Sequence, residues 1–423
     1  MFVASILSLA LGFQEPAWAE PPISYGVRAA SDVVSQLDAE IAAGERTFRP
    51  GGEPLDLEAL LDALQIPIAS QVTIFSSPSL QARRITPRHP RALYFNDEVY
   101  LGFVPGGNLI EVMAIDPHEG ITFYSMDRKA EKPRFERETH RCLQCHAPSH
   151  SGGLPAFLLR SLHPEANGDP NFAAGSHYVD PATPFEDRWG GWYVTGQVGQ
   201  MGHLGNQTIE PGQARLGPKN ERYLSLAKLC DTNAYPTDTS DIVALLVLEH
   251  QTYVHNVLAG AAYEARRALD YQRVFNEALG EPEGTPVAST TSRLANAATL
   301  VVDALIGIHE EPLPGPVGAR SPFAEVFESS ATRDAQGRSL RDLDLESRLF
   351  RYPLSYLIDS TGVRSLPEPL AALVWTRLSE LFFEPLGADD RRKYGGRIDE
   401  ASRRAVVEIL ASTGGASFRS PVR

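Results

Sequence analysis

The sequence predicts an α+β fold with an antiparallel β-rich N-terminal portion, a loop-rich middle and a mostly helical C-terminal half. Short β-branched and aromatic runs separated by turn signals fill residues 71–124. Gly, Pro, Asn and His dominate residues 142–236 with little periodicity, and helical periodicity prevails beyond residue 241. At 423 residues and 43% apolar composition, the chain is long enough for two or three packed domains.

The N-terminal elements are two helices followed by a meander. Apolar side chains at helical spacing predict helices over residues 32–43 and 55–64. Five short runs predict strands, at 72–75, 92–95, 99–104, 109–115 and 121–124. Turn residues separate most of these runs, at 96–97, 105–108 and 117–120. This pattern is typical of an antiparallel meander.

The C-terminal half is predicted to be helical. Helical spacing extends over residues 242–279, 291–310, 370–383 and 401–412. The Pro-rich and polar stretch 311–338 is predicted to be a loop.

Residues 1–19 have the pattern of a secretory signal peptide. An apolar run from Phe2 to Phe13 precedes Ala17-Trp18-Ala19, a small-x-small cleavage site. A first core helix is the alternative interpretation. No later apolar stretch approaches the ~20 residues that a membrane span needs. We therefore expect a periplasmic or otherwise exported protein without a transmembrane segment after signal cleavage.

Acidic residues outnumber basic ones. The formal net charge is −14, from 53 Asp and Glu and 39 Lys and Arg. This balance argues against nucleic acid and anionic membranes as partners, and it favours a partner protein with a basic docking surface.

One motif carries the chemistry of the chain. Cys142-Leu143-Gln144-Cys145-His146 matches the attachment pattern of a c-type haem. Positions i and i+3 share one face of a helical turn, so both thiols can add to haem vinyl groups while His146 directs its imidazole at the iron. We predict one covalent haem c, held by Cys142, Cys145 and His146. A redox-active dithiol or half of a zinc site is the alternative, although neither a βαβ context nor a second ligand pair is apparent.

Two features outside the motif bear on this prediction. An axial histidine needs an acceptor for its second ring nitrogen, and we expect the carbonyl of Pro155 to be that acceptor. Cys230 is the third cysteine, and an odd number cannot form a full set of disulfides, so we expect a buried small apolar residue there.

Further stretches resemble a known family. They are Arg188–Gly196, Gly202–Asn206, Leu248–Gln251 with His255-Asn256, and Phe350–Ile358. Together with the haem motif, they resemble large bacterial monohaem c-type cytochrome-domain proteins over roughly residues 90–423. The resemblance implies haem binding and export, and it implies no particular substrate. Leu204 and Pro181 stand where that family has Met and His, so this chain lacks a methionine ligand at that point.

The sixth position of the iron has several candidate ligands. We predict His203, in the Gly-rich loop 196–205 whose glycines would let the backbone approach a flat ring. Met201 in the same loop is an alternative. His250 and His255 are also candidates, but at five residues apart on a helix they cannot both face one iron. An open sixth position is the remaining possibility.

Three more residues belong to the expected haem surroundings. Trp189 and Trp192 are expected to pack as core aromatics against the haem edge. Arg188 is expected to pair either with a haem propionate or with an acidic side chain.

These observations divide the chain into a signal peptide (1–19), N-terminal helices with a β-meander (20–130), a haem-binding segment that is cytochrome c-like around the haem (131–240) and a helical region (241–423). Electron transfer is the predicted function. A haem oxidoreductase of the peroxidase or oxygenase kind, or a haem-based sensor, is the alternative and would need an open iron position. The sequence singles out no catalytic residue.

Overall fold

The computed structural model of the protein describes residues 18–49, 55–76 and 78–413. Its α-helices are α1 (Val33–Ala43), α2 (Leu57–Ala63), α3 (Leu143–His146), α4 (Ile242–Leu279), α5 (Ala288–Ile306), α6 (Phe323–Ser329), α7 (Thr361–Arg364), α8 (Glu368–Phe383), α9 (Ala388–Tyr394) and α10 (Glu400–Thr413). Its strands are β1 (Val72–Ile74), β2 (Arg91–Phe95), β3 (Val99–Phe103), β4 (Leu109–Asp116), β5 (Gly120–Asp127), β6 (Glu136–Arg137), β7 (Arg160–Leu162), β8 (Ser176–Tyr178) and β9 (Trp192–Tyr193). Residues 1–17 of the predicted signal peptide lie outside the described residues.

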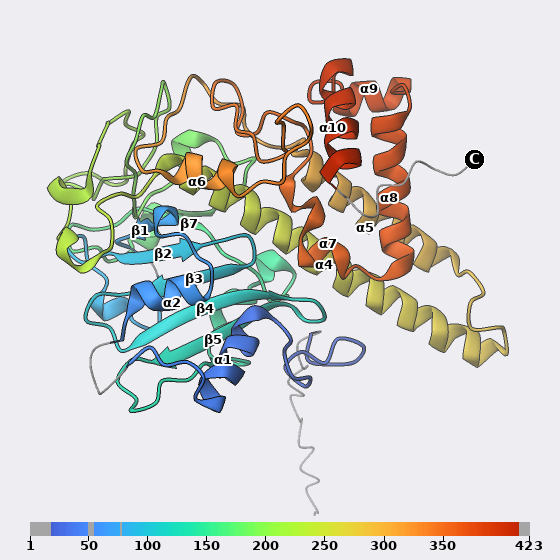
Figure 1. The fold of residues 1–423 in the computed structure, drawn as a ribbon, viewed down its shortest axis with the longest axis horizontal. Helices are drawn as coiled ribbons and strands as arrows, with labels where there is room; N and C mark the ends of the chain where they lie inside the picture. The colour runs from blue at the N-terminus through green and yellow to red at the C-terminus, as the bar shows by residue number, and fades with distance from the viewer. Residues whose placement is uncertain (1–17, 50–54, 77, 414–423) are drawn as a thin grey trace, which may run out of the picture.

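The strands form one large antiparallel sheet and one small one. The large sheet has the order β6-β5-β4-β3-β2-β1-β9, and β7 pairs with β8. Figure 1 shows β1 to β5 side by side in this order. Strand β9 follows the haem motif in the chain, yet it pairs with β1. The segment predicted to bind haem therefore contributes a strand to the sheet of the N-terminal portion.

Polar side chains close two of the hairpin turns. Oδ1 of Asn96 accepts hydrogen bonds from the N–H groups of Glu98 and Val99 at 3.0 and 2.8 Å. Oδ1 of Asp116 accepts two further backbone N–H groups in the next turn, which ends at Gly120 with φ +70°. These turns fix the register of β2 with β3 and of β4 with β5.

The two faces of the large sheet pack against different partners. One face forms a cluster with α1 and α2 that includes Ala92, Tyr94, Leu101, Ile110, Val112 and Tyr124. The opposite face contributes to a larger cluster, the main core, which includes Phe95, Tyr100, Ile115, Phe123 and much of α4. Side chains alternate between the faces with the period of two expected for strands. The haem motif lies on the main-core side, because Leu143 and Cys142 pack against that cluster.

Helix α4 connects the sheet to the C-terminal helices (Figure 1). Its N-cap Asp241 accepts the N–H of Val243 at 2.9 Å, and every residue from 242 to 252 is buried. A helix that is buried all round lies inside a protein rather than on its surface. It ends at Gly280, whose φ of +70° is the left-handed conformation common at helix ends.

The structure confirms the predicted α+β class, with an antiparallel sheet and a helical C-terminal half. Helix α4 has the predicted bounds, and β1 to β5 lie where the meander was expected. The prediction of a loop over residues 311–338 is wrong at α6, where Phe323 and Phe327 bury one side of a short helix. A helix of two turns is too short to show helical periodicity in the sequence.

Within the described part of the chain, no helix combines the length and the apolar character needed to cross a lipid bilayer.

Gln251 joins α4 to three other elements. Its Nε2 donates to the carbonyl of Asn96 and to the hydroxyl of Tyr100, both at 2.6 Å. Its Oε1 accepts from the hydroxyl of Tyr356 at 2.6 Å. Gln251, Tyr100 and Tyr356 are buried and Asn96 is half-buried, and an unmade hydrogen bond in such a setting carries a desolvation cost.

We predict that Gln251→Leu lowers the free energy of unfolding by about 3 kcal/mol, because two buried hydroxyls and one half-buried carbonyl lose their partner. Urea denaturation followed by circular dichroism measures this. The exposed residue Gln36 provides the control, since Gln36→Leu should change stability by less than about 0.5 kcal/mol. Equal stability of the two variants would contradict the prediction.

Candidate functional site

Helix α3 presents the side chains of the haem motif. The N–H groups of Cys145 and His146 both donate to the carbonyl of Cys142, at 3.1 and 2.9 Å. Both cysteines are free thiols, and Cys142 is half-buried against the main core whereas Cys145 is exposed. The two thiols are therefore presented on one short turn at the border between core and solvent.

A backbone hydrogen bond orients His146. Its Nδ1–H donates to the carbonyl of Ala156 at 2.9 Å, so the acceptor lies one residue beyond the expected Pro155. The imidazole ring also lies 5.1 Å from the ring of Phe123 on β5. Burial lowers the pKa of His146, which favours the neutral ring. Because Nδ1 carries the proton, Nε2 keeps its lone pair for another partner.

A partly open patch of the sheet lies beside the motif. In β2 and β4, half-buried residues alternate with buried ones, so one face is incompletely covered there. Leu93 and Met113 are half-buried residues of this face, and Gly102 lies on the strand between them. Met113 is paired with Phe123, whose ring contacts His146. We call Leu93, Gly102 and Met113 the sheet shelf.

An ion pair borders the sheet shelf. Nη2 of Arg91 lies 3.1 Å from Oε2 of Glu111, and the guanidinium covers Gly102, where an added Cβ would lie 2.5 Å from Nη2. Nε of Arg91 and Oε2 of Glu111 are nevertheless buried without a hydrogen bond to any described residue, because the ion pair lacks hydrogen-bond geometry. The charges of Arg91 and Glu111 contribute to the pKa shifts of Cys142 and His146. An arginine with a spare donor beside an apolar shelf fits a haem propionate.

The thiol of Cys142 is held in its neutral form. Burial, followed by the carboxylates of Glu138 and Glu111, raises its pKa to about 12. Glu138 also accepts a hydrogen bond from the hydroxyl of Ser125 at 2.6 Å and pairs with Arg141. A redox-active dithiol needs a thiolate of low pKa, so this environment disfavours the dithiol alternative.

His203 is buried with hydrogen bonds that do not suit an iron ligand. Its Nδ1 accepts the N–H of Gly205 at 3.0 Å, so the proton of the neutral ring resides on Nε2. That Nε2 is buried without a partner among the described residues. Burial lowers the pKa of His203 to about 4. Ligation through Nε2 would require the opposite tautomer and loss of the Gly205 hydrogen bond.

His250 has partners for both ring nitrogens. Nδ1–H donates to Glu310 at 2.5 Å, and Nε2 accepts from the hydroxyl of Ser355 at 2.7 Å. Ser355, His250 and Glu310 thus have the hydrogen-bond order of a hydrolase triad. However, Ser355 is 2% exposed and the adjacent cavity is about 10 Å³, which is too small for a substrate. We interpret the three residues as a buried structural network.

The other two candidate ligands are enclosed by the core. Met201 is fully buried in the main core. His255 is 1% exposed, and its Nε2–H donates to the carbonyl of Asp97 at 2.7 Å. Its Nδ1 has no hydrogen-bond partner in the described part of the chain. The structure therefore does not bring either side chain to the sheet shelf in an exposed position.

Arg188 forms the acidic pairing that the sequence left open. Its Nη1 lies 2.6 Å from Oε2 of the buried Glu249, and the indole N–H of Trp189 donates to Oε1 of the same carboxylate at 2.7 Å. Trp189 and Trp192 are both buried in the main core. This network fixes the start of the 188–196 stretch on α4.

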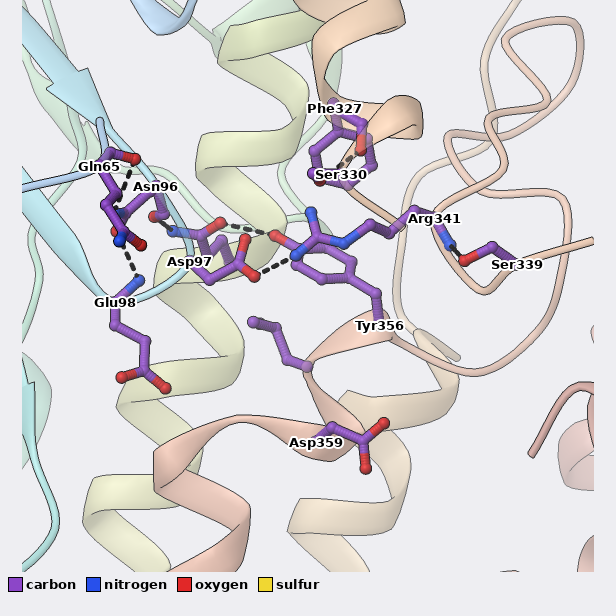
Figure 2. Close-up of polar contacts among 12 residues, drawn as sticks. Gln65, Asn96, Asp97, Glu98, Phe327, Ser330, Ser339, Arg341, Tyr356 and Asp359 are labelled. Atoms are coloured by element: carbon purple, nitrogen blue, oxygen red, sulfur yellow. Dashed lines mark hydrogen bonds and ion pairs between the residues drawn. The ribbon is translucent and has the colours of Figure 1, made fainter. Parts of the chain in front are cut away.

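A cleft of about 1100 Å³ lies elsewhere, between the Asn96–Glu98 turn and the region from α6 to α7. No residue of the haem motif lines it. Figure 2 shows Arg341 reaching Asp97 beside Tyr356. The guanidinium lies 4.4 Å from the ring centroid of Tyr356 and 4.8 Å from that of Phe327. Arg341 thus joins the walls of this cleft.

Known proteins provide no further assignment: no family model, no curated protein and no solved structure matches the chain. Within the described residues, no group of three or more His, Cys, Asp or Glu side chains is arranged to hold a metal ion. The chemical interpretation therefore depends on the motif and its surroundings.

Sequence reasoning missed the sheet shelf and its charged border. Arg91, Leu93, Glu111 and Met113 occupy alternate positions of two strands, which is a signal that the sequence contains. Their proximity to the motif arises from strand register and from the return of residues 142–157 onto the sheet, and neither can be read from spacing along the chain.

We predict that His203→Asn reduces the loss of stability between pH 7 and pH 4.5. The wild-type histidine is neutral when folded and is protonated below about pH 6.5 when unfolded, so its contribution to stability falls as the pH falls, by about 2 kcal/mol between pH 7 and pH 4.5. Asn supplies an acceptor for Gly205 without titrating. Urea denaturation at both pH values measures the free energy of unfolding of each protein. Equal losses of stability in the wild type and in His203→Asn would refute the conclusion that burial keeps His203 neutral in the folded protein.

We also predict that, in protein without haem at pH 8, iodoacetamide modifies Cys145 at least tenfold faster than Cys142. Cys145 is exposed, whereas Cys142 is half-buried and its pKa is about 12. Peptide mass spectrometry over time gives both rates, and unfolded protein provides the reference. Comparable rates in the folded protein would show that Cys142 is not shielded.

Proposed function

We propose that this protein carries one haem c, attached through Cys142 and Cys145 with His146 as an axial ligand, and that it transfers electrons. The observation that carries the proposal is the orientation of His146. Its Nδ1–H is fixed on the carbonyl of Ala156, which leaves Nε2 as the ligating atom. Both thiols of the motif are free, with Cys142 at the N-cap of α3 and Cys145 within that helix.

The surroundings of the motif support a flat prosthetic group at this position. Leu93 and Met113 of the sheet shelf are half-buried apolar side chains, and Arg91, whose guanidinium covers Gly102, has a buried Nε without a hydrogen bond to any described residue. The haem would supply one-electron chemistry at its iron. The chain would hold it through two thioether bonds, orient His146 and neutralise a propionate with Arg91. In this sense we expect a cytochrome c-like attachment within residues 131–240.

Electron transfer is favoured over catalysis by the state of the candidate acid–base residues. Both nitrogens of His250 are engaged, and His203 is enclosed by the protein at 1% exposure. A peroxidase or oxygenase needs an acid or base beside an open iron position. The half-buried setting of the motif would instead bring a haem edge close to the surface, where a partner can exchange electrons.

The proposed setting is the periplasm or another exported location, as the signal-like residues 1–19 suggest. The proposed partner is a redox protein with a basic docking surface, because the chain has a net charge of −14. We also propose that the chain is a relative of the large monohaem c-type cytochrome-domain proteins that its motifs resemble.

The test is expression of the full chain with the c-type haem maturation machinery. We predict haem that stays with the protein on a denaturing gel, and its loss in the double variant Cys142→Ser, Cys145→Ser. Cys230→Ser is the matched control and should retain haem, since Cys230 packs in a separate cluster with Phe75 and Tyr193.

Absence of covalent haem from the wild-type protein would overturn the proposal. With haem attached, the reduced protein should not bind carbon monoxide and should exchange electrons with a small redox protein in a salt-dependent reaction. Immediate binding of carbon monoxide by the wild-type protein would instead favour the oxidoreductase or sensor.

A further inference from the structure

The end of α4 carries an apolar stripe that faces solvent. Four large apolar residues share one side of the helix there: Tyr271, Val274, Phe275 and Leu279. We call these four residues the helix-end stripe, and their exposed fractions range from 39 to 62%. Figure 1 shows this part of α4 projecting away from the sheet. A contiguous exposed apolar surface of this kind is typical of a protein interaction site.

Another side of the same helix end already has partners. Asn276 is buried there, and its Nδ2 donates to the carbonyls of Glu283 and Thr285 at 3.0 and 2.9 Å. These two bonds hold the linker before α5 against the helix. On the helix-end stripe itself, the rings of Tyr271 and Phe275 stack with their centroids 5.8 Å apart. The helix-end stripe is therefore ordered before any partner binds, which reduces the entropy lost on association.

Charges at the two ends of the helix-end stripe have opposite signs. Arg267 lies about one turn before Tyr271, whereas Glu281 and Glu283 follow Leu279. None of these three charged side chains forms an ion pair within the described part of the chain. One end of the helix-end stripe is thus basic and the other is acidic, and both ends have charges available to a partner.

We propose that the helix-end stripe binds the same stripe of a second copy of this chain, with the two helices antiparallel. A two-fold axis at Phe275 places this ring against its own counterpart. Positions equally far before and after Phe275 then face each other, so Tyr271 of one copy lies opposite Leu279 of the other, and Arg267 lies opposite Glu283. The basic end of each stripe meets the acidic end of the other, whereas parallel helices would bring like charges together. This interaction lies beyond the proposed electron transfer and does not depend on bound haem.

A lipid surface matches the helix-end stripe less well than a second copy does. The flank of the stripe carries Asp270 and Glu277, which both pair with Arg273. With Glu281 and Glu283 at the tip, acidic side chains outnumber basic ones around the stripe, and the anionic surface of a membrane repels them. An unrelated protein would need its own matching charge pattern, whereas a second copy supplies that pattern by symmetry.

The first experiment is sedimentation velocity of the full chain over a range of concentrations. One helix face is smaller than the roughly 800 Å² per partner of a stable complex, so we expect a monomer–dimer equilibrium with a dissociation constant on the order of 50 μM. Phe275→Glu should remain monomeric, because it places two carboxylates on the two-fold axis. Leu300→Glu is the matched control and should dimerise like the wild type, because it adds the same charge at a residue that is 60% exposed on α5, outside the helix-end stripe.

An exchange of charges tests the antiparallel arrangement. Arg267→Glu and Glu283→Arg should each weaken dimerisation about tenfold, because two symmetry-related attractions become repulsions. The double variant Arg267→Glu, Glu283→Arg should recover the wild-type dissociation constant, since both attractions return with their signs exchanged. Circular dichroism establishes that each variant is folded.

A wild-type protein that stays monomeric up to about 300 μM would overturn the proposal, as would a dimer that Phe275→Glu leaves intact. Failure of the double variant to recover would contradict the antiparallel arrangement. Binding of the monomer to phosphatidylglycerol vesicles that is lost in Phe275→Glu would assign the helix-end stripe to a membrane surface instead. None of these measurements requires haem, so their outcome is independent of the test of the proposed function.

Discussion

The burial of the first half of α4 is the constraint on which the rest of the structure depends. Residues 242–252 are enclosed on all sides, by the sheet and by the C-terminal helices. Their polar side chains can exist there only with partners, which is why Glu249 holds Arg188 and Trp189, His250 holds Glu310 and Ser355, and Gln251 holds the β2–β3 turn. Each of these bonds ties a different segment of the chain to one rigid helix.

The buried helix α4 also orients the haem motif, through the loop that follows α3. The loop after α3 returns to α4 at Phe157, whose backbone N–H and carbonyl both bond the side chain of Asn256. The preceding carbonyl, that of Ala156, is thereby positioned to receive the proton of His146. A residue on the central helix therefore orients the proposed iron ligand through two backbone groups, which is how an outer partner stabilises a metal ligand.

Local sequence pattern was sufficient to predict most helices and strands, but it was insufficient to predict the surroundings of the motif. The 38 residues of α4 carry a capping Asp and a terminal Gly, and the meander carries turn residues between strands, so both could be predicted. The motif at 142–146 was recognisable because its chemistry depends on spacing alone. The partners of His146 depend on contacts between distant segments, such as β4 with β5 and the 142–157 loop with α4. The burial of His203, whose Nδ1 accepts the N–H of Gly205, depends on such contacts as well. No local pattern encodes them.

The most direct test of the account is the intact mass of the exported protein matured with the c-type haem machinery, together with the reduced spectrum of its haem in alkaline pyridine. The account predicts a mass increase of one haem per chain and a spectrum typical of two thioether bonds. A mass equal to that of the polypeptide alone, in cells that attach haem to a control cytochrome, would contradict it.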